Sequence, residues 1–326
     1  MRKILFFPLT AVYYLAYFLW DLCWKMVPSR EVSSRVISVG NIAVGGTGKT
    51  SLVEYLAARF SETDIKTAVV AKGYKRPASS SMVICDSEDH KWELCGDEAA
   101  ALARSLKGIK IYVDSNKTIA AQKASDDGND VIVVDDGFQH RLLKRDLDIV
   151  CINGENPFGN RLLLPSGILR EPIKSLQRAD AFVVFVENND IDISGLKLPA
   201  GKPAFKARKM IVSVETGKNE SMDLNGKKVV GFCGIANPDS FYNTLQNTGA
   251  DIVAFEKFKD HYIYKGEDIK RLIEMMETGN AETAVTTLKD FVKIEKNWPH
   301  DKKLCYIKIS LAIDNEYEFI RLIENE

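Results

Sequence analysis

The segment at 43–50, which reads A-V-G-G-T-G-K-T, constrains the fold more than any other part of the chain. A β-branched run at 35–39 precedes it and a run of helical composition at 51–58 follows it. The segment matches the phosphate-loop pattern G-x-x-x-x-G-K-S/T, with Ala43 in place of the first glycine. Its glycines let successive backbone N–H groups face one anion, and the following helix adds its positive end. The order strand, loop, helix predicts a nucleotide-binding α/β domain rather than a chance glycine-rich turn.

Lysine, threonine and aspartate side chains supply the charges and ligands that a bound nucleotide requires. Lys49 is placed to reach the β- and γ-phosphates, and the Thr50 hydroxyl is placed to bind Mg²⁺. An apolar strand at 131–134 runs into Asp135 and Asp136, and either aspartate or both would hold the metal, directly or through water. The alternative for these aspartates is a capping or turn role. The predicted nucleotide contacts are Ala43, Val44, Gly45, Gly46, Thr47, Gly48, Lys49 and Thr50.

The expected nucleotide is ATP. A GTPase normally carries an N-K-x-D string that binds guanine, and no such string occurs in the chain. The residues T-L-K-D at 287–290 are only a partial echo of it.

Short apolar runs alternate with helix-compatible segments along most of the chain, a pattern typical of a mostly parallel sheet covered on both faces. A polar connector at 188–219 interrupts the alternation, with a hairpin expected at 204–212. We predict an N-terminal membrane-associated helix at 1–27, a phosphate-loop domain with its connector at 28–212, and a smaller α/β domain at 213–326. The other predicted strands are 67–71, 109–113, 149–152, 181–186, 228–233, 252–255, 284–287 and 305–309, and the other predicted helices are 97–106, 117–125, 238–248 and 266–277.

The first 24 residues differ from the rest, because eight of the chain's 15 Phe, 11 Tyr and 4 Trp fall there. Residues 4–20 are uncharged, with basic residues on both sides. A signal peptide is disfavoured because no small-residue cleavage site follows Trp20. A spanning helix needs about 20 apolar residues, which makes this run marginal. A helix in the membrane interface fits the aromatic content better, and a helix packed on the protein's own core is the alternative.

Net charge and cysteine usage exclude other classes of protein. Lys plus Arg total 44 and Asp plus Glu total 45, a balance that argues against a nucleic-acid binder. The six cysteines are scattered in apolar surroundings and form no C-x-x-C motif, which predicts reduced core residues of a cytosolic protein rather than a disulfide framework. No obligate protein partner is evident from the sequence.

A kinase also needs a group that orients and deprotonates an acceptor hydroxyl. Asp97 and Glu98 open a predicted helix, where helix capping is the alternative role. His140 follows the two metal aspartates and His261 follows another acidic residue, although a lone histidine is more often structural. The remaining histidines, His90 and His300, are predicted to be surface residues.

A basic loop at 72–76 follows the predicted strand at 67–71. Loops at the carboxyl ends of parallel strands are where open α/β sheets bind ligands. This loop is therefore a candidate for holding an anionic substrate group, and a solvated basic turn is the alternative.

Taken together and in this order, these strings make the chain resemble the tetraacyldisaccharide 4'-kinase family, the lipid A kinases of outer-membrane biogenesis, over nearly its whole length. Beside the apolar N-terminal helix, the matching strings are S-V-G-N at 38–41, V-G-G-T-G-K-T at 44–50, G-Y at 73–74, G-D-E at 96–98, V-D-D-G-F-Q-H at 134–140, L-P-S-G at 164–167, L-R-E-P at 169–172, G-I-A-N-P at 234–238, Phe258, D-H at 260–261, and Thr287 with K-D at 289–290.

The resemblance implies transfer of the γ-phosphoryl group of ATP, with Mg²⁺, to the 4'-hydroxyl of a tetraacylated disaccharide 1-phosphate, which yields lipid IVA. It implies that Asp97 is the base, working with His261 from the second domain and with Lys49. Since the acceptor is a four-chain lipid, it also implies a monotopic or peripheral enzyme on the cytoplasmic face of the inner membrane. The candidate metal ligands are Thr50, Glu98, Asp135 and Asp136, and the candidate substrate contacts are Lys72, Tyr74, Arg76, Lys117 and Arg170.

The chain departs from the family pattern at three positions. Lys72 and Lys117 stand where the family usually has arginine, and Ile168 stands where proline is common. Lysine cannot form the bidentate fork of arginine to phosphate or carboxylate, so the two lysines cannot make the contacts that arginine makes at these positions.

Two other functions compete with a lipid kinase. A membrane-anchored phosphate-loop ATPase that acts as a switch or assembly factor would need no acceptor base, so Asp97 and His261 favour a kinase. A soluble kinase of a small metabolite is disfavoured by the N-terminal segment.

Overall fold

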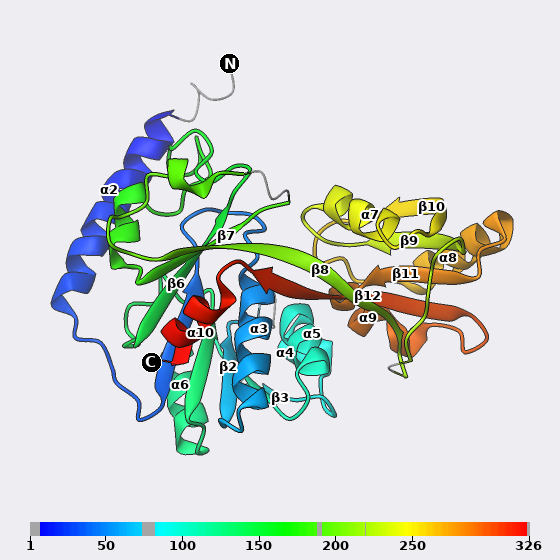
Figure 1. The fold of residues 1–326 in the computed structure, drawn as a ribbon, viewed down its shortest axis with the longest axis horizontal. Coiled ribbons are helices and arrows are strands. Elements are labelled where there is room, and N and C mark those ends of the chain that lie inside the picture. The colour runs from blue at the N-terminus through cyan, green and yellow to red at the C-terminus, as the bar shows by residue number, and fades with distance from the viewer. Residues whose placement is uncertain (1–6, 74–81, 188–190, 219, 325–326) are drawn as a thin grey trace.

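A 12-stranded sheet runs through the molecule in the computed structural model, which describes residues 7–73, 82–187, 191–218 and 220–324 (Figure 1). The strand order is β10-β9-β11-β12-β8-β7-β6-β1-β5-β2-β4-β3. Neighbouring strands are parallel, apart from the antiparallel pairs β8 with β12 and β3 with β4. The predicted mostly parallel α/β sheet is confirmed.

The first lobe consists of the strands around the phosphate loop and the helices that cover them. Most of these strands are buried on both faces, which is why they appear in the sequence as continuous apolar runs. The strands are β1 (Arg35–Gly40), β2 (Thr67–Ala71), β3 (Val83–Cys85), β4 (Lys110–Val113), β5 (Val131–Asp135), β6 (Leu147–Asn153) and β7 (Ala181–Phe185). The helical elements are α3 (Lys49–Glu62), α4 (Trp92–Cys95), α5 (Asp97–Ser105), α6 (Lys117–Asp126), η1 (Ile173–Arg178) and η2 (Ile193–Gly195).

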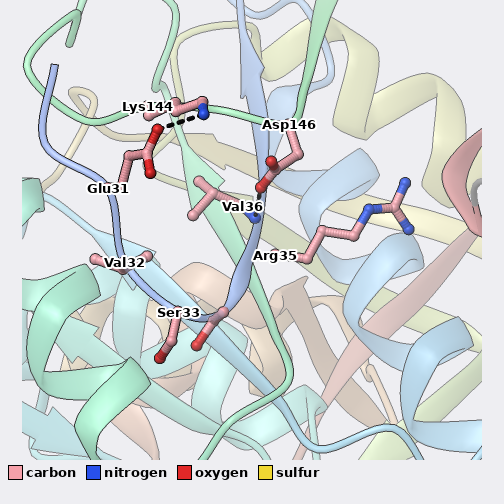
Figure 2. Close-up of a pocket in the computed structure, with 8 residues that line it drawn as sticks. Glu31, Val32, Ser33, Arg35, Val36, Lys144 and Asp146 are labelled. Atoms are coloured by element: carbon pink, nitrogen blue, oxygen red, sulfur yellow. Dashed lines mark hydrogen bonds and ion pairs between the residues drawn. The ribbon is translucent and has the colours of Figure 1, made fainter.

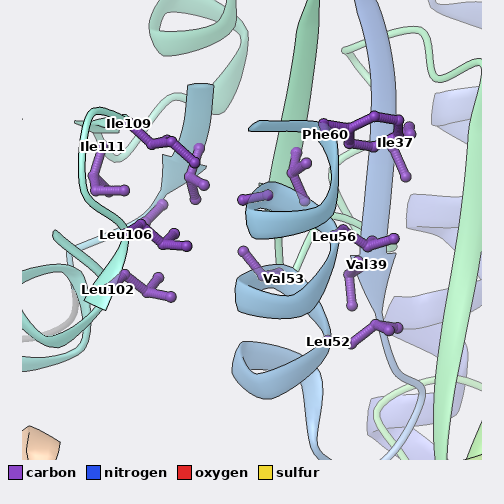
Figure 3. Close-up of a cluster of buried hydrophobic side chains, with 14 of the residues drawn as sticks. Ile37, Val39, Leu52, Val53, Leu56, Phe60, Leu102, Leu106, Ile109 and Ile111 are labelled. Atoms are coloured by element: carbon purple, nitrogen blue, oxygen red, sulfur yellow. The ribbon is translucent and has the colours of Figure 1, made fainter. Parts of the chain in front are cut away.

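The core of the first lobe fixes the position of α3. Leu52 and Leu56 of α3 are fully buried, and they belong to one apolar cluster with Ile37 and Val39 of β1 (Figure 3). Helix α5 lies in the same cluster, whereas α6 covers the opposite face of the sheet with its alanines. The phosphate loop is therefore held between a buried strand and a helix that is anchored along its length.

The second lobe is smaller and has its own two apolar clusters. Helices α8 and α9 cover one face of its strands around Phe232, and α7 covers the other face. Its strands are β9 (Lys228–Cys233), β10 (Asp251–Lys257) and β11 (Thr283–Thr287), and its helical elements are α7 (Pro238–Gln246), α8 (Gly266–Gly279), α9 (Leu288–Ile294) and η3 (Glu295–Asn297).

Two long strands, β8 (Ala204–Thr216) and β12 (Lys303–Ile313), run between the lobes as an antiparallel pair (Figure 1). The hairpin predicted at 204–212 is wrong. The segment is one continuous strand that pairs with β7 at its start and with β12 along its length. Residues 209–212 in its middle are exposed, so the strand lacks the apolar pattern of a buried one. The predicted domain boundary at 212/213 falls inside this strand.

The C-terminal helix α10 (Glu316–Glu324) returns to the first lobe. Its Phe319 is fully buried, with ring centroids 5.0 Å from Phe205 and 6.2 Å from Tyr55 of α3. The end of the chain therefore contributes to the first core, although the sequence places it after the second lobe.

Helix α2 (Phe7–Met26) lies along the outside of the first lobe (Figure 1). In the described part of the chain, no helix has both the length and the apolar character to cross a membrane. The cysteines are free, and five of them are buried. Cys23 lies exposed on α2, so the prediction of a core residue is wrong for that cysteine. The exposed large apolar side chains of α2 are Leu9, Val12, Tyr14, Leu15, Phe18, Leu19, Leu22 and Met26.

Candidate active site

The phosphate loop lies at the carboxyl end of β1, where it turns directly into α3. Gly45 and Gly48 have φ values of 117° and 79°, a region that suits glycine. A Cβ at Gly48 would also lie 2.5 Å from the Phe185 ring, so both conformation and space require glycine there. Val44, Gly45 and Gly46 are exposed. The loop therefore leaves its backbone open to a ligand at the start of a 14-residue helix.

A neighbouring segment holds the loop from its side. The Val44 N–H donates to the Ile168 carbonyl at 2.8 Å, and the Arg170 N–H donates to the Ile42 carbonyl at 2.7 Å. Ala43 forms an isolated antiparallel bridge with the same segment. The first half of the loop is therefore paired with a segment more than a hundred residues later in the chain.

Asp136 lies at the centre of a cluster of positive charge after β5. Its carboxylate is 3.6 Å from Lys49 Nζ, and it accepts hydrogen bonds of 3.0 and 3.2 Å from Arg170 Nη1. Burial alone would raise the pKa of Asp136, but Lys49, Arg170 and Lys117 outweigh burial and lower the pKa below its ordinary value. The structure thus brings together three of the predicted residues, Lys49, Asp136 and Arg170, the last of which was expected at the substrate.

Asp135 has a different environment from its neighbour. Its side chain is buried, and its Oδ1 atom has no hydrogen-bond partner among the described residues. Burial is the main cause that raises the pKa of Asp135 to about 6, and the Glu98 and Asp136 carboxylates contribute to the rise. A buried carboxylate oxygen without a donor is suited to a cation. No group of three or more metal-binding side chains exists among the described residues. Mg²⁺ does not require such a group, because it typically binds one or two carboxylates together with substrate phosphates.

Lys117 does not face the open part of the site. It is buried at the start of α6, and its Nζ donates to the carbonyl oxygens of Asp135 and Asp136, both at 2.6 Å. Burial lowers the pKa of this lysine. The structure gives the side chain a role in holding the backbone after β5, and its expected contact with substrate stays a prediction.

The second part of the site joins the two lobes. Asp97 is buried at the first position of α5, and its carboxylate lies 2.9 and 3.0 Å from Nδ1 of His261, which follows β10. His261 has a φ of 58°, and its N–H donates to the Gly234 carbonyl at 3.1 Å. Burial would raise the pKa of Asp97, but the hydrogen bond with His261 and the charges of Lys289 and Lys293 lower it.

Two lysines of α9 surround this pair, and sequence reasoning assigned no role to either. Lys289 Nζ lies 3.4 Å from His261 Nε2 and 3.9 Å from Asp97 Oδ2. Lys293 is buried, with its Nζ 3.6 Å from Asp97 Oδ2 and 2.8 Å from Asp290 Oδ1. The signal in the sequence was the K-D pair at 289–290, which is a partial echo of a guanine-binding motif and also one of the strings of the family resemblance.

Glu98 lies beside both parts of the site. Its Oε1 is 3.5 Å from Lys289 Nζ and 4.0 Å from His261 Nε2, and its charge contributes to the raised pKa of Asp135. The carboxylate is thus between the acid–histidine pair and the aspartates after β5. Its expected role as a metal ligand stays a prediction.

The remaining candidates occupy the rim of the site or lie outside the described residues. Lys72 is exposed after β2 and is close enough to Lys117 and His140 to lower the pKa of each. The candidates Tyr74 and Arg76 fall in 74–81, outside the described residues.

The other histidines have structural surroundings. His140 Nε2 is 2.9 Å from Thr118 Oγ1, and burial together with the charge of Lys117 lowers its pKa to about 4. His90 is not a surface residue as predicted, because its ring is half-buried 3.7 Å from Glu295. His300 is exposed, as predicted.

A separate polar groove of about 460 Å³ lies at the opposite end of β1 from the phosphate loop (Figure 2). Lys144 pairs with Glu31 there, Asp146 accepts the Val36 N–H at 2.7 Å, and Arg35 Nη1 donates to the Ile323 carbonyl at 2.5 Å. This groove contains none of the predicted site residues.

Comparison with known proteins identifies similar chains. The family described as "Tetraacyldisaccharide-1-P 4'-kinase" matches residues 2–326. The Halothermothrix orenii protein named tetraacyldisaccharide 4'-kinase is 34% identical, with 92% of this chain and 85% of that protein covered. The Elusimicrobium minutum protein of the same name is 34% identical, with 93% and 84% covered. A crystal structure of LpxK from Aquifex aeolicus in complex with ATP has a TM-score of 0.82 and 27% identity, and covers 100% of this chain and 99% of that one.

Proposed function

The chain belongs to the tetraacyldisaccharide-1-P 4'-kinase family of lipid A biosynthesis, and from this premise we propose how its residues divide the work of phosphoryl transfer. The enzyme transfers the γ-phosphoryl group of ATP to the 4'-hydroxyl of tetraacyldisaccharide 1-phosphate and forms lipid IVA. The membrane-anchored ATPase switch, the alternative from the sequence, is not supported by any relative reported above.

ATP binds at the carboxyl end of β1. The backbone N–H groups of residues 45–50, at the start of α3, surround the phosphates, and Lys49 neutralises their charge. Lys49 is pre-positioned for this because Asp136 holds its ammonium group at 3.6 Å. Arg170 shares the same carboxylate, so two cations converge where the γ-phosphate would lie.

Mg²⁺ fits the residues after β5. Asp135 offers a buried oxygen without a donor, and the Thr50 hydroxyl lies in the first turn of α3. Asp136 and Glu98 complete the candidate ligand set, directly or through water. When bound, the ion neutralises charge that develops on the phosphoryl oxygens.

Asp97 is the general base, and His261 orients it. The observation that carries this assignment is the 2.9 Å contact between the Asp97 carboxylate of the first lobe and the His261 ring of the second. With Lys289 and Lys293 nearby, Asp97 stays ionised and can accept the proton of the acceptor hydroxyl as that oxygen attacks phosphorus. The junction between the lobes therefore forms the acceptor side of the site.

The acceptor lipid approaches the rim formed by Arg170 and Lys72, with Tyr74, Arg76 and Lys117 as the further predicted contacts. The outward apolar face of α2 lies in the cytoplasmic surface of the inner membrane, where such a lipid resides. The exposed leucines at 15, 19 and 22 are spaced as one stripe of a helix, which supports an interfacial position.

The test is phosphoryl transfer from γ-labelled ATP to a tetraacyldisaccharide 1-phosphate in mixed micelles. We expect Asp97→Asn to retain ATP binding and to lower kcat by about 10²–10⁴, because the amide cannot accept the proton. Full activity of that variant would refute the base assignment. Label recovered only in free phosphate with the unmodified chain would contradict the reaction itself.

A further inference from the structure

Helix α2 is attached to the first lobe through a row of polar side chains on its inner face. The Tyr13 hydroxyl donates to the Arg170 carbonyl at 2.9 Å, and the Tyr17 hydroxyl donates to Glu171 Oε2 at 3.1 Å. These partners belong to the segment at 166–175, which we call the platform. Two further hydrogen bonds join α2 to the platform. Thr10 Oγ1 donates to Ser166 Oγ at 2.7 Å, and the Tyr17 hydroxyl lies 2.8 Å from Ser175 Oγ.

The platform is also the segment that holds the phosphate loop. Its residues Ile168 and Arg170 exchange backbone hydrogen bonds with Val44 and Ile42 at 2.8 and 2.7 Å. The Arg170 side chain reaches on to Asp136 at 3.0 Å. One segment is therefore bonded to α2 on one side and to the phosphate loop and Asp136 on the other.

Glu171 makes the same connection through side chains. It is 1% exposed and accepts from Tyr17 OH on α2 and from Gln139 Nε2 at 3.1 Å. The same Gln139 amide donates to the Asn41 carbonyl at 2.8 Å, directly before the phosphate loop. The same Oε2 atom also accepts from Arg178 Nη2 at 2.9 Å, so loss of the Tyr17 hydroxyl would leave Glu171 paired within the first lobe but would remove its hydrogen bond to α2.

We infer that α2 is a positioning element of the nucleotide site, with Tyr13 and Tyr17 holding the platform against the phosphate loop. This role is separate from that of the apolar outer face, which points away from the platform. It rests on the proposed binding of ATP at 43–50.

The test measures binding of a fluorescent ATP analogue, in the presence of Mg²⁺, to full-length chains in detergent without acceptor lipid. The temperature is kept well below the midpoint of thermal unfolding of each chain. The double variant Tyr13→Phe/Tyr17→Phe removes the two hydroxyls and leaves the rings. We expect its Kd for the analogue to rise about five- to tenfold, from the loss of the three hydrogen bonds that these hydroxyls make to the platform. Sedimentation with phosphatidylethanolamine–phosphatidylglycerol vesicles should be unchanged, because the outer face is intact.

The matched control is Tyr14→Phe, since Tyr14 is exposed on the outer face of the same helix. It should leave the Kd unchanged. Equal Kd values for the double variant and the unmodified chain would overturn the inference while leaving the proposed function intact. Equal weakening by Tyr14→Phe would also overturn it, because the platform contacts would not be the cause. Failure of the unmodified chain to bind the analogue would instead contradict the proposed nucleotide site, and the inference with it.

Discussion

At the scale of single residues, Lys293 connects the buried charges of the second lobe to Asp97, the proposed base in the first. Its partner Asp290 accepts from the Gly234 N–H and the Thr287 hydroxyl, both at 2.8 Å, while the Gly234 carbonyl accepts the His261 N–H. One buried ion pair thus supports both members of the Asp97–His261 pair.

Neutralising this ion pair should lower catalysis more than ATP binding. Removing only one partner of a buried ion pair costs about 3–5 kcal/mol of folding stability. The test therefore replaces both partners, as Asp290→Asn/Lys293→Met. The amide of the new asparagine can still accept the Gly234 N–H. We expect kcat to fall about tenfold or more, with little change in the KM for ATP, because Asp97 loses a charge that holds it. Lys293→Arg should retain most of the activity.

Lys296→Met is the control, because Lys296 is exposed on η3. Steady-state kinetics against ATP and acceptor lipid measure both parameters. A kcat equal to that of the unmodified chain would show that the Lys293 charge plays no part in the acceptor side of the site.

Motif spacing predicted part of the site because phosphate loops place their residues locally. Lys49 and Thr50 follow from the strand–loop–helix order, and Asp135 and Asp136 follow from their place at the end of another apolar strand. Lys293 could not be predicted in this way, because only the packing of α9 against α5 brings it to Asp97. Arg170 was expected at the substrate, whereas its additional contact with Asp136 depends on the platform.

At the scale of elements, the alternating apolar runs were sufficient to predict the parallel strands, since both faces of these strands are buried. The same pattern failed for β8, whose middle is exposed between the lobes, and it gave no sign that α10 returns to the first core. Burial depends on tertiary neighbours, and those of β8 and α10 come from segments that are distant in the chain.

The return of α10 predicts an effect on the stability of the first lobe. Phe319→Ala removes a fully buried ring that contacts Phe205 and Tyr55, and should reduce the free energy of unfolding by about 3–5 kcal/mol. Tyr317→Ala, at a side chain that is 74% exposed on the same helix, should change it by at most about 0.5 kcal/mol. Urea unfolding followed by fluorescence compares the two, and equal losses would contradict the docking of α10.

At the scale of the whole molecule, the exposed apolar stripe of α2 predicts which surface of the enzyme binds the membrane. Leu15→Ser/Leu19→Ser should reduce vesicle sedimentation at least tenfold, because each buried leucine contributes about 1.5–3 kcal/mol of transfer free energy. Met210→Ser, at an exposed apolar residue of β8, is the control and should have no effect. If both variants bind vesicles equally, α2 is not the membrane-binding element.

The two-lobed arrangement divides phosphoryl donor from acceptor along one sheet. In the proposed mechanism the donor side is built by the first lobe alone, while the acceptor side needs His261 and α9 from the second. Because β8 and β12 carry the sheet unbroken from one lobe to the other, any change in the distance between the lobes must twist this pair of strands.

The inward polar face and outward apolar face of α2 have a consequence for kinetics. An enzyme held at an interface meets its acceptor in two dimensions, so its rate follows the mole fraction of that lipid in the surface. Adding inert detergent while the bulk concentration of the acceptor stays constant would then slow the reaction. Apparent Michaelis constants for the acceptor would depend on its mole fraction in the surface.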